Sequence, residues 1–85
     1  MSKPLSEWKQ KEGKLVRIIT FSNFKEVVSA VNKISMIAEK MNHHPDLEIF
    51  SYKNLRIKIH THELNKLTEK DFDLAMKIDS LLSGM

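Results

Sequence analysis

Cysteine is absent from the 85-residue chain, which excludes disulfides, thiolate nucleophiles and every cysteine-ligated metal site. Glycine and proline occur only twice each, so the chain has no glycine-rich phosphate-binding loop and no flexible linker. No apolar run approaches the roughly 18 residues of a membrane span, and residues 1–14 contain no apolar run typical of a signal peptide. These absences predict one soluble cytoplasmic domain that spans residues 1–85.

The charged residues are nearly balanced and interleaved along the chain. Fourteen Lys and Arg oppose eleven Asp and Glu, which gives a formal net charge of +3. This pattern is typical of a solvated surface, so neither membrane association nor direct nucleic-acid binding is expected. A chain of this length buries only about two-thirds of its unfolded surface, and oligomerisation is therefore expected to supplement its stability.

The first part of the chain predicts a β-hairpin. The run Leu15–Phe21 is short, apolar and β-branched, as strands are. Residues 7–10 can pair back to it across a turn at residues 11–14, where Gly13 supplies the positive φ that such a turn needs.

Residues 22–42 predict a long amphipathic helix. Ser22 or Asn23 is the expected N-cap, and Glu26 fits a capping box with Asn23. Apolar side chains recur at three- and four-residue steps and form one stripe, which consists of Phe24, Val27, Val28, Val31, Ile34, Ala38 and Met41. Additional apolar surface, expected to form a subunit contact, comprises Ala30, Met36 and Ile37.

Residues 47–62 predict a second hairpin, with its turn near Lys53 and Asn54. Its second strand alternates: one face carries Leu55, Ile57 and Ile59, and the other carries Arg56, Lys58, His60 and His62.

Residues 68–82 predict a second helix, with Thr68 as N-cap and Asp71 as its capping-box partner. Its expected buried side comprises Phe72, Ala75, Met76, Ile78 and Leu82. Two hairpins joined through a helix predict an α+β fold, a two-layer sandwich in which a four-stranded antiparallel sheet has helices packed on one face.

All four histidines lie between positions 43 and 62. The zinc signature H-E-x-x-H fails at Lys66, and the consecutive His43 and His44 diverge in regular structure, so no metal site is expected. Taken singly, His44 fits a simple turn before Pro45, and His60 fits a solvated strand face. Taken together, several imidazoles predict acid–base chemistry, because imidazole exchanges protons near neutral pH.

A wider pattern includes these histidines. It consists of Glu39, three residues, His43-His44-Pro45, six residues, Tyr52, nine residues, His62, eight residues and Asp71. This pattern resembles the signature of the pterin-4a-carbinolamine dehydratase family. The flanking segments agree, and the resemblance covers nearly the whole chain, from Trp8 through ITFSNF and AEKMNHHPD to THE and LTEKDFDLA.

The resemblance implies the same α+β sandwich, assembled as a homodimer or homotetramer. It also implies that the chain binds a small-molecule pterin and removes water from 4a-hydroxytetrahydrobiopterin, giving quinonoid dihydropterin in tetrahydrobiopterin recycling. Two proton transfers are sufficient for this dehydration, so neither a cofactor nor a metal is expected.

The resemblance further implies a role for each residue of the pattern. His43 and His62 are expected to transfer the protons, and His44 is expected to position the pterin and to exchange protons in its turn. Asp71 is expected either to orient His62 through a hydrogen bond or only to cap its helix. Glu39 is expected either to tune His43 electrostatically or to be solvated.

Three further residues are expected near the substrate. Pro45 stiffens the turn, Tyr52 packs or contacts the pterin, and Thr61 binds the pterin through its hydroxyl or backbone. Asn42 and Leu47 depart from the acid and the aromatic that are usual in the family, and these changes bear on substrate preference.

Two alternative functions would use the same fold. One is action on another pterin, in molybdopterin metabolism, and the other is a protein-dimerisation or coactivator module. An adjacent gene for an aromatic amino-acid hydroxylase would favour recycling, and adjacent molybdenum-cofactor genes would favour the other pterin.

Overall fold

Two antiparallel hairpins form one sheet. The computed structural model describes residues 7–61, 64 and 66–84. Strand β1 (Lys9–Lys11) pairs with β2 (Lys14–Thr20), and β3 (Asp46–Phe50) pairs with β4 (Asn54–Ile59). Strand β2 also pairs antiparallel with β4, from Leu15 opposite Ile59 to Thr20 opposite Asn54, so the sheet order is β1-β2-β4-β3.

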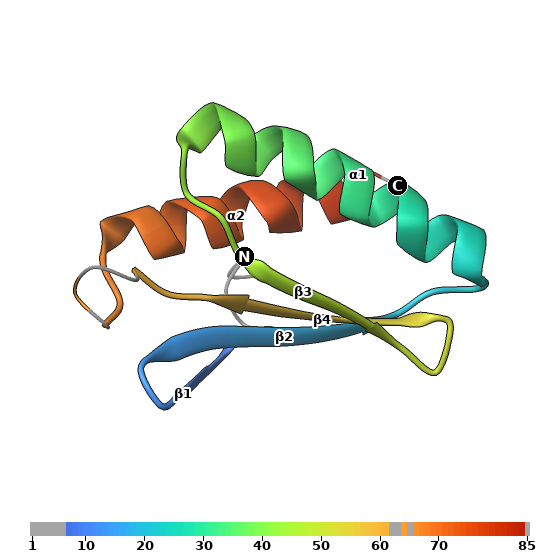
Figure 1. Ribbon diagram of the computed structural model, residues 1–85, viewed down its shortest axis with the longest axis horizontal. Coiled ribbons are helices and arrows are strands. Elements are labelled where there is room, and N and C mark those ends of the chain that lie inside the picture. Colours follow the sequence, from blue (N-terminus) through green and yellow to red (C-terminus); the bar gives the residue numbers. More distant parts are fainter. Residues whose placement is uncertain (1–6, 62–63, 65, 85) are drawn as a thin grey trace.

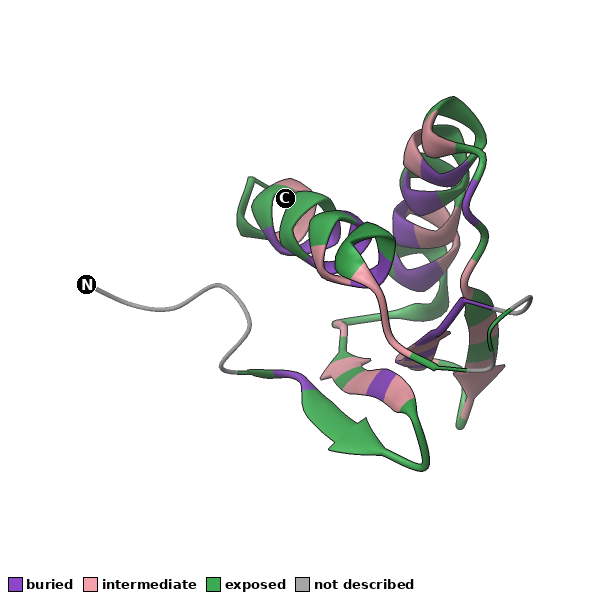
Figure 2. Ribbon diagram, turned by 90° about the vertical axis from the view of Figure 1, so that its left-hand side faces the viewer, coloured by how far each residue is buried: buried purple, intermediate pink, exposed green. Residues whose placement is uncertain are grey.

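Both helices cover the same face of this sheet (Figure 1). Helix α1 (Phe24–Met41) joins the two hairpins, and α2 (Glu69–Ser83) follows β4. The sides of the helices that face each other and the sheet carry the buried residues (Figure 2). The predicted α+β two-layer sandwich is therefore confirmed. No helix within the described residues is long and apolar enough to cross a membrane.

The first hairpin forms, but its first strand is Lys9–Lys11 rather than residues 7–10, and Lys11 and Lys14, predicted in the turn, pair with each other. Glu12 (φ 54°) and Gly13 (φ 75°) both adopt positive φ, the requirement of the tight turn that best matches strand twist. The strand that follows begins at Lys14, one residue earlier than predicted.

Asn23 begins α1 as predicted. Its side-chain oxygen accepts the backbone N–H of Glu26 at 2.9 Å, and the Glu26 carboxylate accepts the N–H of Ser22 at 3.0 Å. Val27, Ile34 and Ala38 are buried as the stripe requires, but Phe24 is 53% exposed. Phe24 is the first residue of the helix and lies at the end of the apolar stripe.

Less apolar surface is exposed on α1 for a subunit contact than the sequence predicts. Ala30 is fully buried and belongs to the core of the single chain, and Ile37 is partly buried and packs against that core. Met36 alone of the three is freely exposed, at 69%. Ala30 and Ile37 therefore belong to the apolar stripe that packs within one subunit.

The second hairpin turns two residues earlier than predicted. Ser51 (φ 48°) and Tyr52 (φ 55°) adopt the left-handed conformation, whereas Asn54 is already paired with Phe50 in the sheet. In β4 the predicted alternation is confirmed, since Leu55, Ile57 and Ile59 are all fully buried.

Helix α2 places Leu74, Ala75 and Ile78 in the core. Leu74 was not expected there, and Met76, which was, is 48% exposed. Met76 lies two positions after Leu74, about 200° around the helix, so both residues cannot face the sheet. Phe72 and Leu82 are partly buried and pack at the margin of the core.

A buried polar cluster ties α2 to the sheet. Asp79 is 8% exposed, and its Oδ1 accepts a hydrogen bond from Trp8 Nε1 at 2.8 Å and an ion-paired hydrogen bond from Arg17. This cluster joins the segment before β1, strand β2 and helix α2.

Candidate active site

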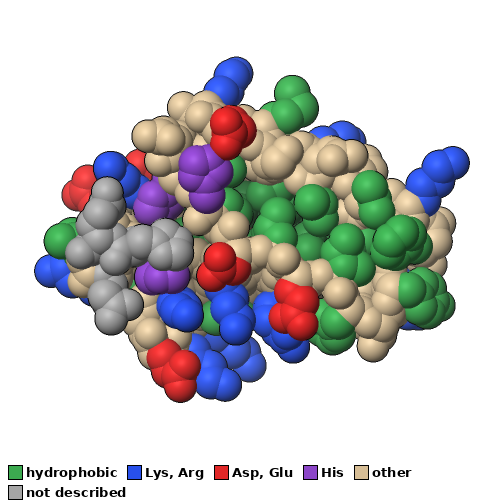
Figure 3. Space-filling view, in the orientation of Figure 1, with side chains coloured by type: hydrophobic (Ala, Val, Ile, Leu, Met, Phe, Trp, Pro, Cys, Tyr) green, Lys and Arg blue, Asp and Glu red, His purple; other side chains and the backbone are tan. Residues whose placement is uncertain are grey.

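The candidate site lies where α1 ends, β4 ends and α2 begins. These three points come together at one end of the molecule (Figure 1). Histidine side chains gather at this same end, in purple at the left of the space-filling view (Figure 3).

The end of α1 directs the two consecutive histidines apart. Asn42 adopts a left-handed conformation (φ 52°, ψ 41°), which asparagine tolerates better than most residues. Its N–H donates to Glu39 O at 3.2 Å, and the N–H of His43 donates to Ala38 O at 3.1 Å, the pair of bonds that closes a Schellman motif. After this turn His43 is buried and His44 is exposed.

Asp71 is the buried partner of His43. The Oδ1 atom of Asp71 lies 2.6 Å from Nε2 of His43, and the Asp71 side chain has no exposed surface. Oδ2 of Asp71 accepts the backbone N–H of Thr68 at 2.7 Å and the hydroxyl of Thr61 at 2.9 Å. One carboxylate thus connects the end of α1, the end of β4 and the start of α2.

These contacts keep Asp71 ionised. Burial acts to raise the pKa of the Asp71 carboxyl, but the hydrogen bonds from His43, Thr68 and Thr61, together with the charge of His43, outweigh burial and hold the pKa below its ordinary value. Asp71 also lies in the first turn of α2, where the helix dipole favours negative charge.

The ionised carboxylate determines the tautomer of His43. A carboxylate only accepts hydrogen bonds, so we infer that His43 carries a proton on Nε2. In the neutral imidazole Nδ1 is then the unprotonated nitrogen, and Nδ1 is the atom that can take or give a proton. This arrangement is a buried acid–base dyad.

His44 has a different partner. Its Nε2 lies 2.6 Å from Oε2 of Glu39, and both side chains are exposed, by 54% and 76%. Glu39 was expected either to tune His43 or to be solvated. Its exposed side chain pairs with His44, because the turn at Asn42 sends His43 inward and leaves His44 beside the last turn of the helix.

The structure bears on three other predictions about this region. Thr61 was expected to bind the pterin through its hydroxyl or backbone; Thr61 is 6% exposed and its hydroxyl contacts Asp71 and Thr68, and its contact with a pterin stays a prediction. Tyr52 was expected either to pack or to contact the pterin; it is 61% exposed at the turn between β3 and β4, at the opposite end of these strands, so it does not pack, and its contact with a pterin stays a prediction. His60 was expected to be solvated and is 8% exposed; β4 ends at Ile59, so its alternation does not extend to position 60.

The remaining sequence candidates are Pro45 and His62. Pro45 is half-buried with a trans peptide bond and leads directly into β3, consistent with a stiff turn after the histidine pair. His62 lies outside the described residues, so its expected proton transfer and its expected contact with Asp71 stay predictions.

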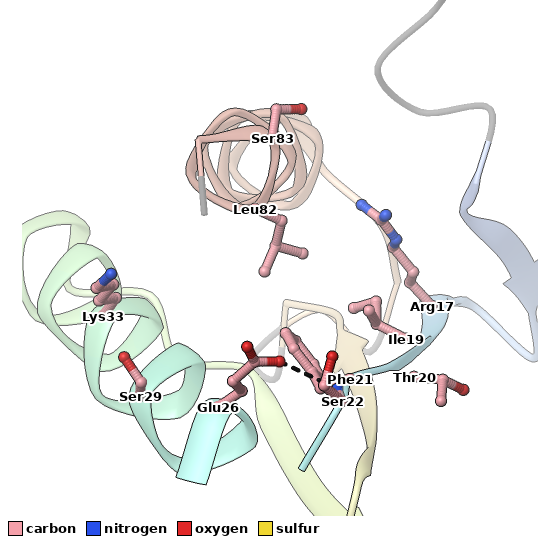
Figure 4. A pocket seen from close by; sticks show the side chains of 10 residues that line it. All are labelled: Arg17, Ile19, Thr20, Phe21, Ser22, Glu26, Ser29, Lys33, Leu82 and Ser83. Atoms are coloured by element: carbon pink, nitrogen blue, oxygen red, sulfur yellow. Dashed lines mark hydrogen bonds between the residues drawn. The ribbon is translucent and has the colours of Figure 1, made fainter. Parts of the chain in front are cut away.

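A separate cavity of about 740 Å³ lies elsewhere in the fold. Its lining comes from β2, the segment after it, α1 and the end of α2, and comprises Arg17, Ile19, Thr20, Phe21, Ser22, Glu26, Ser29, Lys33, Leu82 and Ser83 (Figure 4). None of these residues is a histidine. Despite its size, this cavity therefore lacks the imidazole that the dyad supplies.

Among the described residues, no group of three or more His, Cys, Asp and Glu side chains could hold a metal ion. His43 and His44 each pair with a single carboxylate, and these carboxylates belong to different helices.

The fold and the dyad together define a small α+β protein with a buried histidine–aspartate acid–base pair. The model of the pterin 4 alpha carbinolamine dehydratase family matches residues 1–81, and the chain belongs to this family of hydro-lyases.

Similar proteins agree with this membership. Two cyanobacterial proteins named as pterin-4-alpha-carbinolamine dehydratases are similar to it. The one from Trichodesmium erythraeum is 46% identical over 91% of this chain and 82% of its own length. The one from Picosynechococcus is 44% identical over 88% of this chain and 80% of its own length.

Two solved structures share the fold. A transcriptional coactivator/pterin dehydratase from Brucella melitensis superposes with a TM-score of 0.82 at 25% identity, over 88% of this chain and 81% of that one. A pterin dehydratase-like RuBisCO assembly factor of the alpha-carboxysome gives a TM-score of 0.69 at 17% identity, over 87% and 84%. The second likeness concerns the fold alone.

Proposed function

We propose that this chain removes water from a pterin 4a-carbinolamine, 4a-hydroxytetrahydrobiopterin, and releases quinonoid dihydropterin. The family match over residues 1–81 supports the reaction class. The observation that carries the catalytic proposal is the 2.6 Å hydrogen bond between His43 and the fully buried Asp71, because it joins two positions of the family signature in one acid–base pair.

The reaction requires two proton movements. The bond between the ring carbon and its hydroxyl breaks as a proton reaches the departing oxygen, and water leaves. The neighbouring ring nitrogen loses its proton, and the electron pair of that N–H bond forms the new carbon–nitrogen double bond. The dehydration exchanges no electrons with another molecule, so positioned acid–base groups are sufficient.

His43 is suited to one of these transfers. Asp71 holds Nε2 and stabilises the imidazolium that forms when Nδ1 takes a proton. His62 is the proposed group for the second transfer. His44, exposed and supported by Glu39, is proposed to position the pterin ring.

A hydroxylase-coupled assay tests this function. Purified protein is added while an aromatic amino-acid hydroxylase generates the carbinolamine, and the decay of the carbinolamine is followed by absorbance. We expect decay well above the spontaneous rate. A folded sample that leaves this rate unchanged contradicts the proposal and favours a role as a protein-binding module, such as the coactivator role in the name of the Brucella protein.

The same assay tests whether a metal takes part. A chelator is expected to leave the rate unchanged, because the proposed transfers use imidazole and carboxylate groups alone. Loss of activity that added zinc restores would instead indicate a metal enzyme.

The protein is proposed to act as a homodimer or homotetramer. Met36 on α1 remains 69% exposed, and β3 is an edge strand in the described part of the sheet, so both a helix surface and a sheet edge are available to a second copy. Light scattering at micromolar concentration is expected to give a mass of at least two chains, and a monomer alone would contradict this.

A further inference from the structure

The Asp71 carboxylate is held by two threonines besides its histidine. Thr61 follows β4, and Thr68 is the N-cap of α2. The Thr61 hydroxyl lies 2.9 Å from Asp71 Oδ2 and 2.7 Å from the Thr68 hydroxyl, and the Thr68 hydroxyl lies 3.4 Å from the same Oδ2. Thr61 is 6% exposed and Asp71 is fully buried.

The protons of these hydroxyls can be assigned by counting. Each threonine hydroxyl has one proton, and ionised Asp71 has none to offer. The short Thr61–Asp71 contact therefore requires the Thr61 proton, which leaves the Thr68 proton to bridge to Thr61. The Thr68 hydroxyl therefore donates to the Thr61 hydroxyl, and the Thr61 hydroxyl donates to Asp71. Each hydrogen bond polarises the next.

As a result, the two oxygens of the Asp71 carboxylate accept hydrogen bonds from different groups. Oδ2 accepts the Thr68 N–H and the Thr61 hydroxyl, whereas Oδ1 is left for His43 Nε2. The backbone of Thr61 is itself fixed, since its N–H donates to Lys66 O at 3.2 Å. Asp71 therefore cannot rotate without breaking hydrogen bonds in a buried site, where unsatisfied polar groups are costly.

We propose that Thr61 and Thr68 are positioning residues of the dehydratase, and that their linked hydroxyls hold Asp71 with Oδ1 on His43 Nε2. This inference rests on the proposed function. It assigns the Thr61 hydroxyl to Asp71 in place of the expected contact with the pterin. It also assigns Thr68 an effect on catalysis in addition to its role as N-cap. The two threonines act on the reaction only through Asp71 and His43.

The kinetic test compares Thr61→Val with Thr61→Ser. Valine keeps the branched shape and removes the hydroxyl, and serine restores the hydroxyl. We expect Thr61→Val to lower kcat roughly ten- to a hundredfold with little change in KM, as for loss of a hydrogen bond to a charged group. Thr61→Ser is expected to recover most of that loss.

Thr20→Val is the matched control, because the exposed Thr20 hydroxyl bonds to Asn54 at 2.7 Å, and Asn54 is the first residue of β4, whereas Thr61 follows the last. It is expected to keep wild-type kcat. If Thr61→Val also keeps wild-type kcat, or raises KM at unchanged kcat, the positioning role is wrong. Equal losses in Thr61→Val and Thr61→Ser would also overturn it.

The pH profile supplies a readout that a purely structural role would not move. Within residues 7–61, 64 and 66–84, the titratable group that hydrogen-bonds to Asp71 is His43, from the end of α1, and the other partners of its carboxylate are the uncharged Thr61 and Thr68. Loss of the Thr61 donor raises the pKa of Asp71, so the acid limb of kcat is expected to move to higher pH. An unmoved limb contradicts the inference.

A measurement without substrate separates this inference from the proposed function. Nitrogen-15 NMR is expected to show the His43 proton on Nε2 in the wild type and a mixture of tautomers in Thr61→Val. This result would support the positioning role even if the protein lacked dehydratase activity, and an unchanged tautomer would overturn it.

A second variant serves if Thr61→Val folds poorly. Thr68→Gly retains the backbone N–H that binds Asp71, and glycine at an N-cap costs only a few tenths of a kcal/mol. It is expected to lower kcat several-fold and to shift the His43 tautomer in the same direction. Wild-type values of both quantities in this variant would contradict the inference.

Discussion

Asp71 Oδ1 and His43 Nε2 lie 2.6 Å apart although 28 positions separate the two residues in the chain. The contact joins the first turn of α2 to the second residue beyond the end of α1. Because neither helix contains both partners, the acid–base dyad exists only when the sandwich is assembled.

Asp71→Asn is expected to lower kcat by roughly two to four orders of magnitude. The Thr68 N–H and the Thr61 hydroxyl both donate to Oδ2, so the amide oxygen must occupy that position and the amide NH₂ must face His43. His43 Nε2 then has to accept, which moves its proton to Nδ1 and produces the wrong tautomer. The steady-state rate and the nitrogen-15 NMR tautomer are the measurements.

Asp73→Asn is the control for this substitution, since Asp73 is an exposed carboxylate on the same helix. It is expected to leave both quantities unchanged. An Asp71→Asn variant with wild-type kcat would show that the dyad takes no part in the rate-limiting chemistry.

Asp71 also predicts a loss of stability in acid. Its pKa is lower in the folded protein than in the unfolded chain, so the unfolded state binds its proton first as the pH falls. The contribution is complete above the unfolded pKa of about 3.9 and is lost as the pH falls through the lower folded pKa. Urea unfolding between neutral pH and acid measures it.

The wild type should therefore lose more free energy of unfolding in this acid range than Asp71→Asn, which has no carboxyl at position 71. The difference between the two proteins is expected to narrow as the pH falls. A constant difference would mean that Asp71 has the same pKa in both states.

Glu39→Gln is expected to have a small effect on stability, less than about 1 kcal/mol, because the Glu39–His44 pair is exposed on both sides. If His44 positions the pterin, the variant should raise KM by a few-fold more than it lowers kcat. A loss of kcat as large as that of Asp71→Asn would instead place Glu39 in the proton-transfer step.

Arg17→Met is expected to lower the free energy of unfolding by about 1–3 kcal/mol, because it leaves the nearly buried Asp79 charge with only Trp8 as a described partner. Arg56→Met is a matched control, since Arg56 pairs with the 56%-exposed Glu48 side chain, and less than about 1 kcal/mol is expected. Equal urea midpoints for the two variants would contradict this ranking.

Local chemistry made much of the fold predictable. Alternation in β4, the Asn23 N-cap and the glycine turn at position 13 each depend on residues close in sequence, and each is confirmed. The second turn was misplaced because bulky residues such as Tyr52 rarely adopt positive φ, whereas Asn54 tolerates it well.

The site was harder to predict than the fold. The family signature selects His43, His44 and Asp71, but spacing along the chain does not say which histidine meets which carboxylate. Asn42 decides that, because its left-handed turn separates His43 from His44. The part played by Thr61 and Thr68 depends on where β4 and α2 meet, which periodicity within either element does not reveal.

The most direct test is the turnover of His43→Ala with the enzymatically generated carbinolamine, in a sample that circular dichroism shows to be folded. Removal of the imidazole that pairs with Asp71 is expected to lower kcat by roughly two to four orders of magnitude. Wild-type turnover in this folded variant would contradict the assignment of His43 as a proton-transfer group and with it the proposed mechanism.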